Sequence, residues 1–168
     1  MALDSAVAEK LKKEYLKPFV EGAITTLSTM AGLTPSIKSI EIVEGDKFSG
    51  DVSAVMGVAG EQGEGFVGVS FIAPLASTIV SKILGLDASE LEDADINDGV
   101  GELINMIAGS AKNALLGTPY VFKAGLPSVI TGKGHEVGFP RNAECWTAKL
   151  GIEEQDFSLH VAYAPHRK

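Results

Sequence analysis

Two polar side chains with complementary chemistry lie one helical turn apart in residues 101–115, GELINMIAGSAKNAL. Glu102 carries a carboxylate, which pairs with cationic groups. Asn105 carries a carboxamide, which both donates and accepts hydrogen bonds and can therefore orient a water molecule. On a helix, an i,i+3 spacing brings the two Cβ atoms to within about 5–6 Å of each other. The sequence thus places a carboxylate and a carboxamide side by side on one face of a helix.

The rest of the segment decides which way this pair faces. On a helical wheel of residues 95–116, one broad apolar stripe forms a core face, made of Val100, Leu103, Ile104, Ile107, Ala111, Ala114 and Leu115. The opposite face is polar and consists of Asp98, Glu102, Asn105, Gly109 and Asn113, flanked by Met106 and Lys112. On the spacing of Glu102 and Asn105 alone, an outer face that is merely solvated is the stronger interpretation.

Gly109 is the unusual member of the polar face. Glycine inside a helix costs about 1 kcal/mol relative to alanine, and an exposed position normally takes a better helix former. A glycine there leaves a flat spot that another backbone can approach closely. Met106 beside it offers an adaptable apolar contact.

Composition narrows the classes of partner. The 168 residues are enough for one domain, which we expect to span residues 1–168, and the formal net charge is −8 with a pI near 4.8. Because no cluster of lysine and arginine offsets this charge, binding to nucleic acid or to an anionic membrane is disfavoured. The single cysteine, Cys145, and the absence of a signal-peptide pattern or a long apolar run indicate a cytoplasmic protein.

The helices and strands that position the polar pair are predicted from the periodicity of apolar residues and from the positions of proline and glycine. A helix is predicted to begin near Pro18 and end at Gly32, a second to run from Pro74 to Gly85, and a third to cover residues 94–117. Strands are predicted at residues 36–44, 51–60, 65–73, 126–132, 144–152 and 157–164, with a glycine hairpin, EQGEG, at 61–65. This order predicts an α+β fold, a mostly antiparallel sheet with long helices packed on it.

Other residue types that often carry chemistry are weaker candidates. TGKGHEVG (131–138) lacks the spacing of a P-loop and is interpreted as a turn. His135, His160 and His166 lack zinc-type spacing, and His160 is interpreted as strand scaffold. Cys145 is interpreted as a packed small hydrophobe. We therefore expect no metal site.

The spacing of four residues adds a resemblance. Asp98-x-x-x-Glu102-x-x-Asn105, followed after 21 residues by Pro127 in PSVITG, resembles the signature of the CheC/CheX/FliY family of chemotaxis phosphatases. LKPFVEGAITTLSTMAGL (16–33) is similar to the first helix of CheX. CheC carries a second site on that helix. Here the corresponding run is Glu21-x-x-Ile24 without asparagine, which matches the single-site CheX pattern.

The resemblance implies a CheX-type fold, a homodimer joined through its sheets, and a phosphorylated CheY-like response regulator as substrate. It implies that Asn105 orients the attacking water and that Glu102 pairs with the active-site lysine of the regulator. Docking would involve Asp98, Met106, Gly109, Lys112 and Asn113. The chain would need no cofactor of its own, because the regulator supplies Mg²⁺. Two alternatives stay open: a non-catalytic interaction module, like the flagellar-switch protein FliM, and a dimerisation domain with a solvated helix face.

Overall fold

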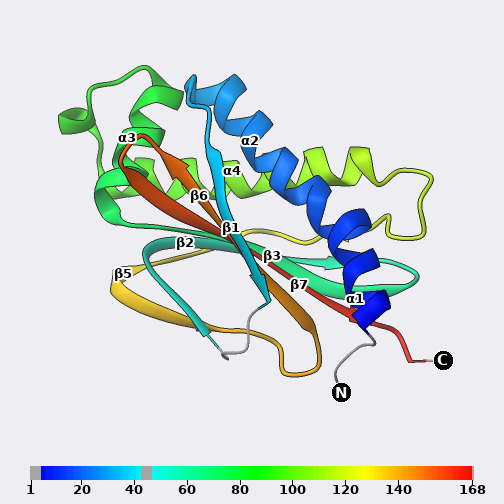
Figure 1. Ribbon diagram of the computed structural model, residues 1–168. Coiled ribbons are helices and arrows are strands. Elements are labelled where there is room, and N and C mark those ends of the chain that lie inside the picture. The colour runs from blue at the N-terminus through cyan, green and yellow to red at the C-terminus, as the bar shows by residue number, and fades with distance from the viewer. Residues whose placement is uncertain (1–4, 43–46, 168) are drawn as a thin grey trace.

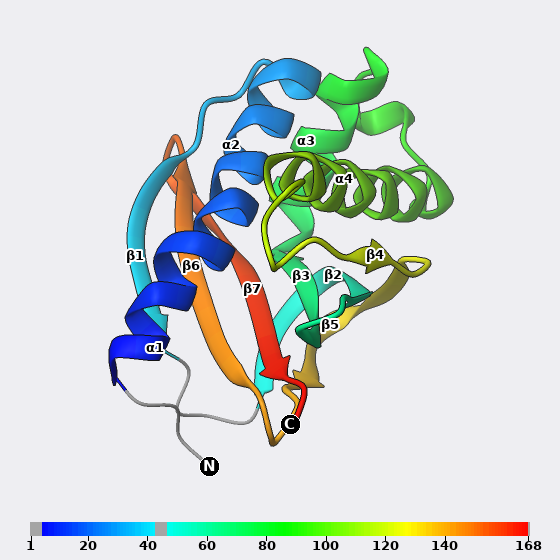
Figure 2. The ribbon, with the colours of Figure 1, turned by 90° about the vertical axis from the view of Figure 1, so that its right-hand side faces the viewer.

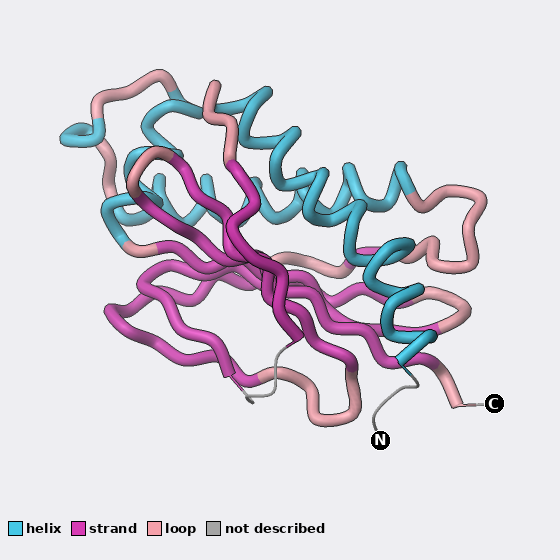
Figure 3. Tube along the Cα trace, viewed as in Figure 1, coloured by secondary structure: helices cyan, strands magenta, loops and turns pink. Residues whose placement is uncertain are grey.

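The computed structural model describes residues 5–42 and 47–167 as one helical layer packed on a curved sheet (Figures 1 and 3). The helical elements are α1 (Ser5–Leu11), a π-helical turn η1 (Lys12–Leu16), α2 (Lys17–Ala31), α3 (Ala73–Leu84), a 3₁₀ turn η2 (Ala88–Glu90) and α4 (Asp93–Ala114). The strands are β1 (Ser36–Ile42), β2 (Lys47–Ala59), β3 (Gly63–Phe71), β4 (Lys123–Ala124), β5 (Ser128–Gly138), β6 (Glu144–Ile152) and β7 (Gln155–Pro165).

The sheet has the order β1-β6-β7-β3-β2, and both β4 and β5 pair along the outer side of β2. All of these pairings are antiparallel, so the predicted α+β architecture is confirmed. Figure 2 shows α2, α3 and α4 together on one face of the sheet. Residues 43 and 44, the predicted end of the first strand, lie outside the described residues.

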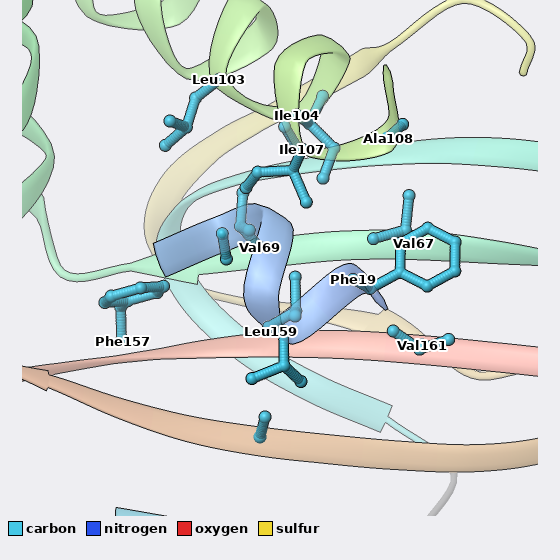
Figure 4. Packing of buried hydrophobic residues seen from close by; sticks show 14 of the residues in the cluster. Phe19, Val67, Val69, Leu103, Ile104, Ile107, Ala108, Phe157, Leu159 and Val161 are labelled. Carbon is cyan, nitrogen blue, oxygen red and sulfur yellow. The ribbon is translucent and has the colours of Figure 1, made fainter. Parts of the chain in front are cut away.

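Alternation along the strands divides the side chains between two clusters. Val67 and Val69 of β3 and Leu159 and Val161 of β7 point to the helices, where they meet Leu103, Ile104, Ile107 and Ala108 of α4 (Figure 4). The intervening residues face the other side. There a smaller cluster joins Phe48, Phe139, Cys145 and Ala162. The larger cluster is the one that seats α4.

Helix boundaries follow the predicted signals closely. Pro18 lies in the first turn of α2, and Gly32 ends that helix with φ 65°, a left-handed conformation that glycine adopts without strain. Gly85 ends α3 in the same way, with φ 68°. At the end of α4 one assignment was wrong: Ala114, expected on the core face, is exposed, whereas Leu115, the residue after the helix, is buried.

One prediction about a glycine segment was wrong. Residues 131–138 are not a turn but the greater part of β5, which pairs with β2 as far as Lys47 and Gly138. Gly132 (φ 140°) and Gly134 (φ 67°) accommodate a bulge opposite Gly50 and Val52, after which the strand continues instead of ending.

In the EQGEG segment, neither Gly63 nor Gly65 has a positive φ. Glycine is needed at 65 for space, because a Cβ there would collide with the carbonyl oxygen of Ala162 in the neighbouring strand. Gly63 already belongs to β3, so the hairpin connection is shorter than predicted.

Candidate functional site

Helix α4, with 22 residues, is fixed at its start by a reciprocal capping box. The backbone N–H of Glu92 donates to Asp95 Oδ2 at 2.9 Å, and the Glu92 side chain accepts from the backbone of Asp95. Asp93 and Asp95 also place negative charge in the first turn, where the helix dipole favours it. The helix is therefore well anchored before the polar face begins.

Three glycines bring α4 into close contact with its neighbours. A Cβ on Gly22 of α2 would lie 3.1 Å from the carbonyl oxygen of Ile107, and a Cβ on Gly99 would lie 2.7 Å from Val80 Cγ2 of α3. A Cβ on Gly101 would lie 3.3 Å from Val129 Cγ2 of β5. Because the three glycines have little room even for a Cβ, α4 packs closely on α2, α3 and β5, and this close packing holds its outer face in position.

The outer face carries the residues that the helical wheel selected. Asp98, Glu102, Asn105, Gly109 and Asn113 are exposed, and Met106 and Lys112 at its margins are half-buried. A Cβ on Gly109 would meet no atom within 4 Å, in contrast to the glycines on the inner faces. Gly109 therefore has no packing role among the described residues, and its helix-propensity cost has no internal compensation.

The side chains of Glu102 and Asn105 make no hydrogen bond or ion pair with any other residue in the described ranges 5–42 and 47–167. Their polar groups are open to solvent. An exposed carboxylate and carboxamide on a rigid helix can pair with a cation and orient a water without first breaking an internal contact.

Strand β5 runs along the same side of α4 as this pair. Val129 contacts Gly101, one turn before Asn105, and Pro127 is half-buried just before the strand begins. The signature proline thus lies two residues before the strand residue that contacts α4. The sequence spacing alone did not indicate this, because the connection between the two is a long irregular segment with the short strand β4 within it.

The histidines and the cysteine lie away from this face. His160 is 3% exposed, and burial lowers its pKa to about 3, so the ring is neutral. Cys145 is buried, and burial together with the charge of Glu144 raises the pKa of its thiol to about 11. Both are scaffold residues, as the sequence indicated.

A line of polar side chains crosses five strands on the sheet face opposite the helices. His135 Nδ1 lies 2.9 Å from the carbonyl oxygen of Gly132, so this nitrogen carries the hydrogen, and Nε2 lies 2.7 Å from Ser53 Oγ. Beyond Ser53 the line continues through hydrogen-bonding contacts from Ser53 to Ser70, from Ser70 to His160 and from His160 to Thr147. These contacts satisfy the buried Ser53, Ser70 and His160 and explain why polar residues occupy this part of the sheet.

No group of three or more histidine, cysteine, aspartate or glutamate side chains that could hold a metal ion occurs within the described part of the chain. In the same part, no helix is long and apolar enough to cross a membrane.

Comparisons with known proteins agree with the resemblance in the sequence. A family model described as chemotaxis phosphatase CheX matches residues 52–150. The chemotaxis protein CheX from Desulfovibrio desulfuricans is 32% identical, with a TM-score of 0.79 over 89% of this chain and 97% of that one. CheX from Vibrio vulnificus is 27% identical, with a TM-score of 0.82 over 89% of this chain and 99% of that one.

A more distant structure is a complex of CheX and CheY with beryllofluoride and Mg²⁺ from Borrelia burgdorferi. Its matching chain is 22% identical, with a TM-score of 0.64 over 89% of this chain and 97% of that one, and so shows the shared fold. A comparison with curated protein sequences gives no match. The family-model match covers more than half of the chain, and the structural relatives cover most of it. The chain therefore belongs to the CheX family of chemotaxis phosphatases.

Proposed function

We propose that this chain is a phosphatase that hydrolyses the aspartyl phosphate of a CheY-like response regulator. One observation carries the proposal. Glu102 and Asn105 lie side by side on a rigid helix, exposed and without internal partners among the described residues. The family and the existence of a relative in complex with CheY support it.

Asn105 is proposed to act on water. Hydrolysis requires a water in line with the phosphorus atom and compensation of charge on the transferring phosphoryl group. The Asn105 carboxamide can accept a hydrogen bond from the water and donate another to a phosphoryl oxygen. Its exposure on a helix face means that it enters the partner's active site as a protruding group, not as part of a pocket of its own.

Glu102 is proposed to set the register of docking. A carboxylate aimed at the phosphoryl group would repel it, so the useful partner is a cation, namely the active-site lysine of the regulator. The surrounding residues would form the docking surface, which comprises Asp98, Met106, Gly109, Lys112 and Asn113. With Glu102 paired to this lysine, Asn105 lies one turn further along the helix and reaches the phosphoryl group beside it.

Magnesium is proposed to come from the regulator. In this chain the site offers one carboxylate and one carboxamide, too few hard oxygen ligands for a Mg²⁺ cage. Bound in the regulator, the ion would neutralise charge on the phosphoryl oxygens, and the residues of this chain would position the docked helix and the water.

We also propose that the chain works as a cytoplasmic homodimer joined through strands of its sheet. In support, β1 is an edge strand of the sheet, and its residues Ile37 and Ile42 are 50% and 53% exposed. Pairing through this edge would leave α4 free on both subunits. Light scattering at micromolar concentration tests the dimer, and a monomeric mass would contradict it.

The function is tested by measuring loss of radiolabel from phosphorylated receiver domains with and without this protein. Accelerated loss with the wild-type chain, and not with the Asn105→Ala variant, supports catalysis. Binding of the receiver without accelerated loss would instead indicate a non-catalytic interaction module. Neither binding nor turnover across the available regulators would contradict the proposal as a whole.

A further inference from the structure

Leu126 is the most exposed of the large hydrophobic side chains in the described residues, at 89%. The backbone around it is nevertheless tightly held. Ala124 pairs with Val58, and Ser128 pairs with Val55 of the same strand. Between them the N–H of Gly125 donates to the carbonyl oxygen of Gly57 at 2.8 Å.

The turn that carries Leu126 is thus tied to β2 on both sides. Pro127, the next residue, has its φ fixed by its ring. A leucine held in this way loses little conformational freedom if a partner covers it.

The contact between Val129 and Gly101 indicates which part of α4 lies near the turn that carries Leu126. Lys133, four residues after Val129, lines the same surface pocket as Asn97, which lies four residues before Gly101. Strand β5 therefore runs antiparallel to α4. Leu126 precedes Val129 by three residues, at most about 10 Å of extended chain, and β5 begins only at Ser128. Asn105 follows Gly101 by about 6 Å of helix. Leu126 therefore lies on the Asn105 side of the contact between Val129 and Gly101. In Figure 2 the turn between β4 and β5 lies beside α4.

A single exposed leucine is ordinary on a protein surface and by itself needs no explanation. Leu126 differs because of where it lies. A standard protein interface covers about 800 Å² on each partner, a patch roughly 30 Å across. A partner that places its phosphoryl group against Asn105 and extends over this side of α4 would therefore also cover Leu126. Buried aliphatic and aromatic side chains near the centre of such a patch contribute most of the binding free energy.

We propose that Leu126 is the apolar anchor of the docking surface and inserts into an apolar depression beside the phosphorylation site of the response regulator. This inference rests on the proposed function and adds the residue that supplies affinity. Polar contacts from Glu102 fix the register, and the leucine supplies buried apolar area from a second element. A second copy of this chain is the less suitable occupant, because it would cover Asn105 as well.

The test compares Leu126→Ala with the wild-type chain in two assays. The first is affinity for a receiver domain loaded with Mg²⁺ and beryllofluoride, and the second is steady-state dephosphorylation. Loss of a fully buried leucine side chain should weaken binding by about 10- to 100-fold. KM should rise to a similar extent while kcat stays close to wild type, because the leucine does not touch the reacting atoms.

Leu86→Ala is the matched control. Leu86 is 42% exposed and lies in the connection between α3 and α4, away from β4 and β5. This variant should leave both affinity and KM unchanged. The thermal midpoint of Leu126→Ala should equal that of the wild type, because the Leu126 side chain is exposed. Leu126→Met, which keeps a large apolar side chain, should retain most of the wild-type affinity.

Three outcomes separate the possibilities. If Leu126→Ala keeps wild-type turnover and affinity, the proposal that Leu126 is the anchor is wrong, whereas the proposed phosphatase function is unaffected. If Leu126→Ala changes the oligomeric state and leaves the affinity for the regulator unchanged, a second copy of the chain covers the leucine. That result would also overturn the anchor proposal. Failure of the wild-type chain to bind or dephosphorylate any receiver would be a failure of the proposed function.

Discussion

Gly99 of α4 lies directly against Val80 of α3, where a Cβ at position 99 would stand 2.7 Å from Val80 Cγ2 and 2.8 Å from Cγ1. Val80 is fully buried and β-branched, so its methyl groups have few alternative positions. Glycine is therefore required at this crossing. Gly109 on the outer face of the same helix has no such neighbour. Replacing each glycine therefore tests a different role: packing inside the protein for Gly99, and contact with a partner for Gly109.

Gly99→Ala should lower the free energy of unfolding by about 1–3 kcal/mol, despite the better helix propensity of alanine, because overpacking outweighs it. Urea denaturation measures the change. In the double variant Gly99→Ala with Val80→Ala, the added methyl group occupies space that the valine vacated. The double variant should be more stable than the sum of the two single changes predicts. Strict additivity would show that the two residues do not contact each other.

Gly109→Ala should have the opposite effect on stability. With open space around the new Cβ, the free energy of unfolding should rise by about 1 kcal/mol. If the docking surface lies against the regulator at this point, the added methyl group should at the same time weaken binding to a receiver domain loaded with beryllofluoride. A variant that is both more stable and equally tight in binding would show that no partner backbone approaches Gly109.

The sequence predicted the part of the site that depends on one helix. Periodicity placed Glu102 and Asn105 opposite the apolar stripe, because a long amphipathic helix has a strong local signal. It could not show that Gly22, Gly99 and Gly101 serve three different neighbours, because each contact joins residues far apart in the chain. For the same reason it did not bring Val129, and with it the turn at Leu126, to the side of α4.

The fold class followed from the order of elements, but β5 did not follow from its own residues. TGKGHEVG reads as a turn locally, with two glycines that adopt positive φ. It becomes a strand because β2 is 13 residues long and offers pairing partners up to Lys47. Tertiary pairing here overrides local propensity. The glycines mark a bulge in the strand and not its end.

Acid should destabilise the protein through His160. Its pKa is about 3 in the folded chain against 6.5 for an ordinary histidine, so the unfolded chain binds a proton between these values and the folded chain does not. Stability from this group is complete above pH 6.5 and is lost as the pH falls toward 3, by about 2 kcal/mol at pH 5.

Urea denaturation at pH 7 and pH 5 should therefore show a smaller loss in His160→Gln than in the wild type. His166→Gln is the control, because it makes the same replacement at an exposed histidine. An identical pH dependence in wild type and His160→Gln would contradict the neutral buried ring.

The isolated chain should not bind Mg²⁺ at the Glu102 and Asn105 pair. Titration calorimetry with MgCl₂ should give no stoichiometric heat, because a single carboxylate and a carboxamide leave most of the coordination sphere to water. Adding a receiver domain should produce Mg²⁺-dependent binding, since we propose that the partner supplies the ion. Tight binding of one Mg²⁺ per chain without a partner would contradict the proposal that the regulator supplies the ion.

Replacements at Asn105 should separate turnover from docking. Asn105→Ala removes the group proposed to orient water but leaves the rest of the exposed face, so kcat should fall by about 10²–10³ while binding to the beryllofluoride-loaded receiver survives. Asn105→Asp keeps the shape but loses the N–H donors and places a negative charge beside the phosphoryl group, so both binding and turnover should decline. Glu102→Ala should weaken binding by leaving the regulator's lysine unpaired. Because Asn105 is exposed, none of these losses should come with a change in the thermal midpoint. Near-wild-type turnover by Asn105→Ala would remove the catalytic role and favour the interaction module.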